Sequence, residues 1–135
     1  MTTSIAKGIE LLDERAGLGA AALKGDAVIY NARLFLRKGD EVTTDPLSIE
    51  TYGLTDRVRV VDGVQLLDHR TILGKRQPIA AVEKTLYGMQ AGGYREVLTA
   101  SHLAYGSKGL PGRIPADAML RIQLWVRDVA SPDQE

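Results

Sequence analysis

The chain has 135 residues, contains no cysteine and carries 17 acidic and 17 basic residues, so its formal net charge is zero. This balance gives no long-range attraction to nucleic acid or to an anionic membrane, and the missing cysteines exclude disulfides, thiolate metal sites and a cysteine nucleophile. Hydrophobic residues make up 44% and charged residues 25%, which is typical of one soluble globular domain.

No apolar run at the N-terminus fits a secretory signal peptide. No stretch approaches the roughly 20 apolar residues that a membrane-spanning helix requires. We therefore expect a cytoplasmic protein without a membrane partner, although a processed precursor would have the same sequence.

The first part of the chain contains a motif with the spacing of a nucleotide-binding loop. Residues 1–7 are expected to be a loose tail, and Ile9–Arg15 either a short strand or a single helical turn. The segment Ala16–Asp26 contains GxGxxA from Gly17 to Ala22, but the dinucleotide fingerprint requires a helix directly after its glycines. Here Gly25 and Asp26 follow within a few residues and a strand begins, so we predict a loop.

Alternating apolar residues predict strands in the next part of the chain. Ala27–Arg37 has one apolar face, formed by Val28, Tyr30, Ala32, Leu34 and Leu36. Lys38–Pro46 is a polar turn. The pattern is poor up to Asp68, although Arg57–Val61 alternates well and Asp62–Val64 is typical of a hairpin turn. A short strand is expected to end at Thr71–Gly74.

One segment, residues 77–93, carries helical periodicity. Pro78 suits the first turn of a helix. The apolar residues Ile79, Val82, Leu86 and Met89 recur at steps of three and four. Gly92 or Gly93 is expected to supply the left-handed stop.

Two more strands are expected near the C-terminus, separated by a loop rich in glycine and proline. Tyr94–Ala100 and Ala118–Val129 are the strands, and the second has an alternating apolar face that includes Ile122. Several strands with one helix late in the chain predict an α+β fold with an antiparallel sheet wrapped around that helix.

Three stretches resemble the FKBP family of peptidyl-prolyl isomerases. They are "LKGDAVIYNARL", the run from "ILGKRQPIAAVEKTLYGMQ" to "AYG", and "GLPGRIPADAMLRIQLWV". The match covers Gly25–Leu36 and Ile72–Val129. It implies a single FKBP-like domain over residues 1–135, with an ordered core over 8–130. It also implies isomerisation of X–Pro bonds in an apolar hollow under a flap, with no cofactor and no metal.

The resemblance also implies roles for individual residues. Tyr30 matches the tyrosine on the first strand of the hollow, and Tyr105 the flap tyrosine whose hydroxyl donates to the substrate carbonyl. Ile79 matches the isoleucine whose backbone N–H donates to a ligand, and Ile114 an apolar flap contact. For Tyr30, a core tyrosine bonded to a backbone carbonyl is the alternative.

Several positions depart from the family pattern. Val82 stands where the family has a tryptophan at the floor of the hollow, and Ile122 where it has a phenylalanine. The family's Phe-Asp pair falls near Val42 and Thr43. The sequence therefore predicts a wider, less aromatic hollow with weaker contacts to a proline ring and to the family's macrolide inhibitors.

A missing carboxylate and a longer connection raise two further questions. Asp40 or Asp45 would replace the carboxylate, unless this segment is only a solvated turn. The connection Pro46–His69 exceeds the family's usual length, and is either a functional rim of the hollow or a hairpin that extends the sheet. His69 and His102 are expected to be surface or packing residues rather than metal ligands.

Three functions remain open at this point. The first is a catalytic prolyl isomerase, of either ordinary or weak activity. The second is a binding protein that holds a proline-containing peptide or a small apolar ligand without catalysis. The third is another chemistry on the same fold.

Overall fold

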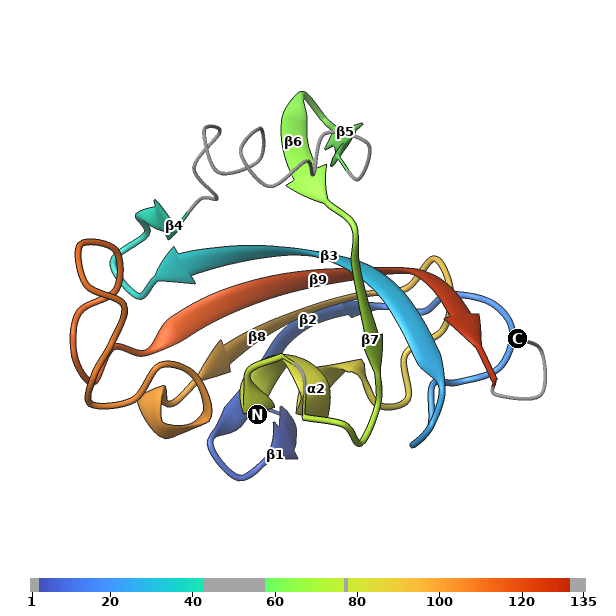
Figure 1. Ribbon diagram of the computed structural model, residues 1–135, viewed down its shortest axis with the longest axis horizontal. Coiled ribbons are helices and arrows are strands. Elements are labelled where there is room, and N and C mark those ends of the chain that lie inside the picture. The colour runs from blue at the N-terminus through green and yellow to red at the C-terminus, as the bar shows by residue number, and fades with distance from the viewer. Residues whose placement is uncertain (1–2, 43–57, 77, 132–135) are drawn as a thin grey trace.

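One antiparallel sheet curves around a short helix in the computed structural model, which describes residues 3–42, 58–76 and 78–131 (Figure 1). The strands of this sheet are β1 (Thr3–Ala6), β2 (Ile9–Arg15), β3 (Ala27–Leu36), β4 (Glu41–Val42), β7 (His69–Ile72), β8 (Tyr94–Thr99) and β9 (Leu120–Ala130). Their order is β1-β2-β8-β9-β3-β4, and β7 also pairs with β3. The helix, α2, spans Ala80–Leu86. The predicted α+β architecture is confirmed.

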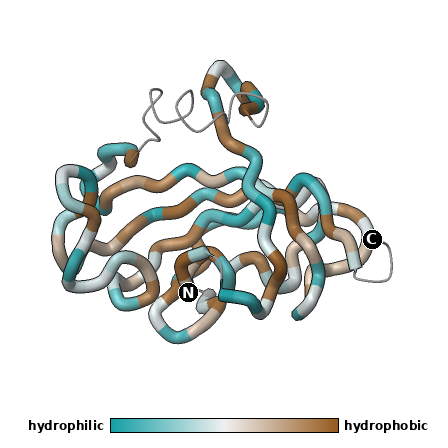
Figure 2. The backbone as a smooth tube through the Cα atoms, in the orientation of Figure 1, coloured by the Kyte–Doolittle hydropathy of each residue, from teal (hydrophilic) through white to brown (hydrophobic). Residues whose placement is uncertain are grey.

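The core lies between the concave face of the sheet and α2. Residues of β9 alternate between buried and partly exposed positions, as the sequence predicts for a strand covered on one face. The apolar side chains that α2 buries against the sheet are Ala81, Val82 and Leu86. Figure 2 shows apolar residues alternating along the strands and gathering on the helix.

Two elements differ from the sequence prediction. Residues 3–6, expected in a loose tail, form β1, which pairs with β2. Helix α2 is shorter than its apolar pattern suggests. The pattern continues to Met89, whereas the helix ends at Leu86. The left-handed stop is Gly88 (φ 83°), whose N–H donates to the Ala22 carbonyl at 2.8 Å. Packing of the Gly17–Asp26 loop against this turn therefore ends the helix before Gly92 or Gly93.

The predicted hairpin is present and stands apart from the main sheet. Strands β5 (Val58–Val61) and β6 (Val64–Leu67) form a two-stranded sheet of their own, drawn in green above the main sheet in Figure 1. Asp62 (φ 51°) and Gly63 (φ 80°) both have left-handed backbone, which is the conformation of a two-residue hairpin turn. The rest of the enlarged connection, residues 46–57, lies outside the described residues.

Candidate functional site

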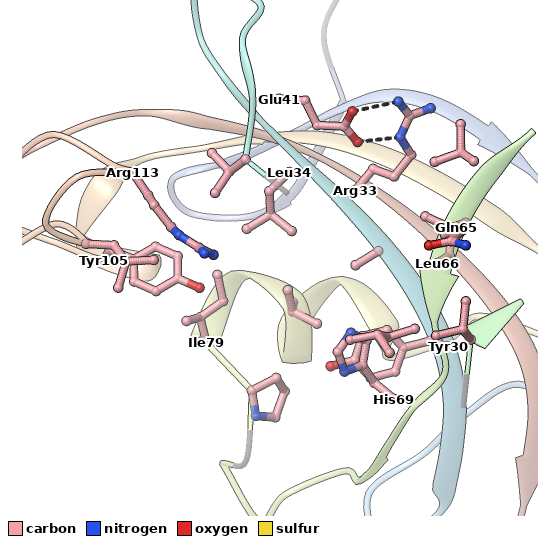
Figure 3. A pocket seen from close by; sticks show the side chains of 18 residues that line it. Tyr30, Arg33, Leu34, Glu41, Gln65, Leu66, His69, Ile79, Tyr105 and Arg113 are labelled. Atoms are coloured by element: carbon pink, nitrogen blue, oxygen red, sulfur yellow. Dashed lines mark hydrogen bonds and ion pairs between the residues drawn. The ribbon is translucent and has the colours of Figure 1, made fainter. Parts of the chain in front are cut away.

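A cavity of about 380 Å³ opens between the concave face of β3, the start of α2, the β5–β6 hairpin and the loop of residues 100–119 that joins β8 to β9. We call this loop the flap. The size of the cavity is within the range of small-ligand pockets. Four residues predicted from the sequence line it together, namely Tyr30, Ile79, Val82 and Tyr105 (Figure 3). We call this cavity the hollow.

Tyr30 forms the wall of the hollow on β3. Its side chain is buried, and its ring stacks on that of His69 with 5.3 Å between the centroids. Burial raises the pKa of Tyr30 to about 12, and the neighbouring Tyr105 adds to the increase. Tyr30 therefore remains a neutral hydroxyl throughout the physiological pH range.

The start of α2 brings a backbone donor to the hollow. Ile79 is the N-terminal cap of the helix, and its carbonyl accepts the N–H groups of Val82 and Glu83. No acceptor for the N–H of Ile79 is found among the described residues, as is usual in the first turn of a helix. The Glu83 carboxylate accepts the N–H groups of Gly74 (2.9 Å) and Arg76 (3.2 Å), which fixes the turn that leads into the helix.

The flap is a stiff loop that places Tyr105 at the mouth of the hollow. Pro111 and Gly112 (φ 79°) occupy the centre of a tight turn in which the Arg113 N–H donates to the Leu110 carbonyl at 2.9 Å. Proline followed by a left-handed glycine is the signature of a type II turn. In Figure 3 the hydroxyl end of the Tyr105 side chain points into the hollow.

The structure places the two remaining predicted residues in the core. Ile114 and Ile122 are both buried in the main apolar cluster and are not among the residues that line the hollow. Ile114 still fixes the flap through its backbone, because it exchanges two hydrogen bonds with Leu110, at 2.7 and 2.8 Å.

Asp40, one of the two predicted replacements for the missing carboxylate, does not line the hollow. Asp40 is exposed and lies 3.4 Å from Lys38, as expected of a solvated turn, while Thr43 and Asp45 lie outside the described residues. Among the residues that the structure describes, Glu41 is the one carboxylate that lines the hollow.

Glu41 forms a bidentate ion pair with Arg33. The two nitrogen–oxygen distances are 2.7 and 2.9 Å, and the Arg33 guanidinium lowers the pKa of Glu41. Sequence reasoning overlooked this pair. Opposite charges on the two sides of the turn between β3 and β4 are the signal that would have indicated it.

His69, Gln65 and Arg113 also line the hollow and were not predicted to do so. His69 is a packing residue, as expected, but it packs within the site. Arg113 lies on the flap and extends toward the hollow beside Tyr105 (Figure 3).

The described residues contain no group of three or more histidine, aspartate or glutamate side chains placed to hold a metal ion. Within the same residues, no helix has the length and apolar character needed to cross a membrane.

A sheet curved over one helix, with an apolar hollow beneath a stiff tyrosine-bearing flap, is the architecture of a peptidyl-prolyl isomerase domain. The chain belongs to the FKBP-type peptidyl-prolyl cis-trans isomerase family, whose model matches residues 20–124. The family predicted from the sequence is thus confirmed.

Relatives and a solved structure agree with this assignment. The chain is 40% identical over 81 residues to peptidyl-prolyl cis-trans isomerase FKBP11 of Bos taurus, a match that covers 59% of this chain and 40% of the relative. It is 32% identical to FK506-binding protein 4 of Chaetomium thermophilum over 86% of this chain and 20% of that protein. The chain therefore spans less than half the length of these relatives. FkpA from Escherichia coli shares the fold with a TM-score of 0.67 at 23% identity, over 96% of this chain and 52% of FkpA.

Proposed function

We propose that this domain catalyses cis–trans isomerisation of X–Pro peptide bonds, with a proline-containing peptide or protein segment as its substrate. Rotation about the amide bond has a barrier of about 18–20 kcal/mol, because the C–N bond has partial double-bond character. That resonance places charge on the carbonyl oxygen, and water stabilises the charge. A site that excludes water while it holds the proline ring favours the twisted, less polar amide.

The observation that carries the proposal is the convergence of Tyr30, Tyr105 and the Ile79 N–H on one largely apolar hollow. In this mechanism the Tyr105 hydroxyl and the Ile79 N–H donate to substrate carbonyls and fix the peptide. Leu34, Ile79 and Val82 surround the proline ring. No group has to gain or lose a proton, which fits a Tyr30 hydroxyl that stays neutral.

Exchange NMR on a short Ala-Xaa-Pro-Phe peptide tests the proposal. The protein should accelerate cis–trans exchange, and Tyr105→Phe should lower kcat/KM by roughly tenfold, because one hydrogen bond to the substrate is lost. Tyr87→Phe is the matched control, since Tyr87 packs against the core without lining the hollow. Equal rates for the wild type and Tyr105→Phe would remove Tyr105 from the mechanism.

Binding without catalysis is the second candidate function. Val82 forms the floor of the hollow, and the single tryptophan of the chain, Trp125, lies against Tyr94 on the other face of the sheet. A less aromatic floor grips a proline ring more weakly. Peptide-induced shifts in the NMR spectrum of the protein, with no acceleration of cis–trans exchange, would favour this function.

The cytoplasmic location stays a prediction.

A further inference from the structure

Two leucines are exposed on one loop at the end of the sheet that lies away from the flap. Leu18 is 84% exposed and Leu23 is 64% exposed, and both belong to the loop of residues 16–26 that joins β2 to β3. We call it the leucine loop. Strand β2 ends beside Tyr94, the first residue of β8, whereas the flap follows the last residue of β8. The leucine loop and the flap therefore lie at opposite ends of the sheet (Figure 1).

The leucine loop is fixed by hydrogen bonds to the turn that follows α2. The N–H groups of Leu18 and Ala22 donate to the carbonyls of Ala91 (2.9 Å) and Met89 (2.8 Å). A Cβ atom on Gly17 would lie 2.2 Å from the Ala91 carbonyl oxygen, so the two backbones are in direct contact. A partner that covers the leucines does not have to order this loop first, which lowers the entropic cost of binding.

Three exposed cations accompany Leu23. Lys24 follows it in the chain, and Lys75 and Arg76 lie on a neighbouring turn. A Cβ atom on Gly74 would lie 2.9 Å from the Lys24 Cγ, so the Lys24 side chain runs over that turn. Backbone hydrogen bonds of 2.8 and 3.0 Å join the leucine loop to the residue that precedes the turn. Within the described residues these three cations form no ion pair with a carboxylate.

The carboxylates next to these cations are bonded to backbone. Asp26 accepts the Leu23 N–H at 2.9 Å, and Glu83 accepts the N–H groups of Gly74 and Arg76. Both carboxylates belong to partly buried residues, whereas the three cations are exposed, so the outer surface is apolar and positively charged. The exposed residues that we call the end patch are Leu18, Leu23, Lys24, Lys75 and Arg76.

An exposed loop of this kind suits the surface of a bilayer that contains anionic lipids. The residues between the two leucines are glycine and alanine, so each leucine extends singly from the loop. A bilayer interface accommodates such single side chains, whereas a protein partner would need a complementary hollow for each of them. Peripheral binding grows with the apolar area inserted and with the attraction between basic side chains and anionic headgroups, and the end patch supplies both.

The zero net charge of the chain is compatible with such a contact. The attraction of a basic side chain to an anionic surface falls off within a Debye length, which is about 8–10 Å at physiological salt. The expectation of no membrane partner rests on the net charge and on the lack of a spanning stretch, and neither describes a local patch.

We propose that the end patch binds the surface of a bilayer that contains anionic lipids, with Leu18 and Leu23 inserted among the headgroups and the three cations beside the phosphates. The flap then lies at the end of the sheet away from the bilayer, so the hollow stays open to protein segments near the membrane. The inference goes beyond the proposed function and does not depend on it, since no residue of the end patch lines the hollow.

Sedimentation with lipid vesicles tests the end patch. Vesicles of phosphatidylcholine with about 30% phosphatidylserine should bind the protein at least roughly tenfold more strongly than vesicles of phosphatidylcholine alone. The double variant Leu18→Ser, Leu23→Ser should weaken this binding by roughly tenfold or more. The matched control is Leu12→Ser, Val60→Ser, which should bind as the wild type does. Its two side chains are 44% and 65% exposed but lie on β2 and β5.

A charge variant tests the contribution of the cations. Lys24→Gln, Lys75→Gln, Arg76→Gln should remove most of the difference between the two kinds of vesicle, because the attraction to phosphatidylserine is lost. Circular dichroism establishes that each variant is folded. Equal binding of the wild type to both kinds of vesicle, or no binding to either, would overturn the proposal. Binding that survives unchanged in the folded double leucine variant would overturn it as well.

Fluorescent labelling identifies the inserted residues, because the chain has no cysteine of its own. An environment-sensitive dye is attached to Leu18→Cys, Leu23→Cys or, as the control, Leu12→Cys. Vesicles with phosphatidylserine should shift the emission of the first two to shorter wavelength and leave the third unchanged. No shift at Leu18 and Leu23, or the same shift at all three positions, would contradict insertion of the leucine loop and overturn the proposal.

Discussion

Tyr30 couples the ionisation of a single side chain to the stability of the fold. Its pKa rises from 10.0 to about 12 in the folded protein, so the folded state binds its proton more tightly than the unfolded state does. The contribution of Tyr30 to stability is therefore fully present below pH 10 and is lost as the pH rises from about 10 to about 12. Tyr94 acts in the same direction, because burial also raises its pKa.

We predict that the free energy of unfolding falls with pH in this range, and that Tyr30→Phe removes about 2–3 kcal/mol of the dependence. Urea denaturation at several pH values between 9 and 12 measures it. Tyrosine absorbance in the ultraviolet reports the ionisation directly. Parallel pH profiles of the wild type and Tyr30→Phe would contradict this assignment.

The site residues that were predictable from the sequence are those whose side-chain direction is fixed by neighbouring residues in the chain. Tyr30 lies in a ten-residue strand of clear alternation, and Tyr105 in a loop stiffened by proline and glycine, so both reach the hollow as predicted. The residues that sequence reasoning overlooked, such as Glu41 and His69, enter the hollow through strand pairing. Pairing depends on tertiary contacts that the local pattern does not contain.

Among the elements, the flap depends on glycines for two separable reasons. A Cβ atom on Gly109 (φ 62°) would lie 2.3 Å from the Ile114 carbonyl oxygen, whereas one on Gly112 (φ 79°) would meet nothing within 4 Å. Gly112→Ala should cost only the left-handed backbone strain, about 1–2 kcal/mol. Gly109→Ala should cost more and also lower kcat/KM, because the turn that carries Tyr105 must shift. Thermal denaturation and exchange NMR measure the two effects, and equal losses of stability in the two variants would contradict the steric argument.

The side chains of Asn31, Arg59, Asp68 and Arg127 form a hydrogen-bonded network that attaches the β5–β6 hairpin to β3 and β9, and we call it the anchor network. Asn31→Leu leaves the Leu67 carbonyl and part of Asp68 without their buried donor, so we expect a loss of about 2–4 kcal/mol and faster hydrogen exchange in β5 and β6. Arg59→Lys is the control at the solvent end of the network, where the Arg59 side chain is 42% exposed and the expected cost is below about 1 kcal/mol. Unchanged exchange in the hairpin of Asn31→Leu would show that other contacts attach it.

Element types were predictable and some boundaries were not. The strands and the Asp62-Gly63 turn follow from alternation and turn chemistry, which are local signals. The end of α2 at Leu86 does not, because it depends on the distant loop that accepts the Gly88 N–H. Pairing with β2 likewise orders residues 3–6, which have no strong pattern of their own.

At the scale of the whole molecule, β3 and β9 pair along ten residues and join segments that are about ninety residues apart in the chain. Such non-local pairing makes the sheet one cooperative unit and slows its formation to the range of milliseconds to seconds. Trp125 lies in β9, with its ring 5.2 Å from that of Tyr94, and reports on the centre of the sheet. We predict that the unfolding curves from Trp125 fluorescence and far-ultraviolet circular dichroism coincide. Two separate transitions would contradict a single unit.

The position of the β5–β6 hairpin outside the main sheet has a consequence for how such a domain diversifies. An insertion or exchange in this hairpin changes the register of neither the strand that carries Tyr30 nor the strands on either side of the flap, since β5 and β6 pair only with each other within the described part of the chain. Changes in the hairpin residues that line the hollow can therefore alter its wall while the pairing of the main sheet stays constant. In the laboratory the same separation makes the hairpin a place where other sequences can be grafted to change the wall of the hollow without disturbing the main sheet.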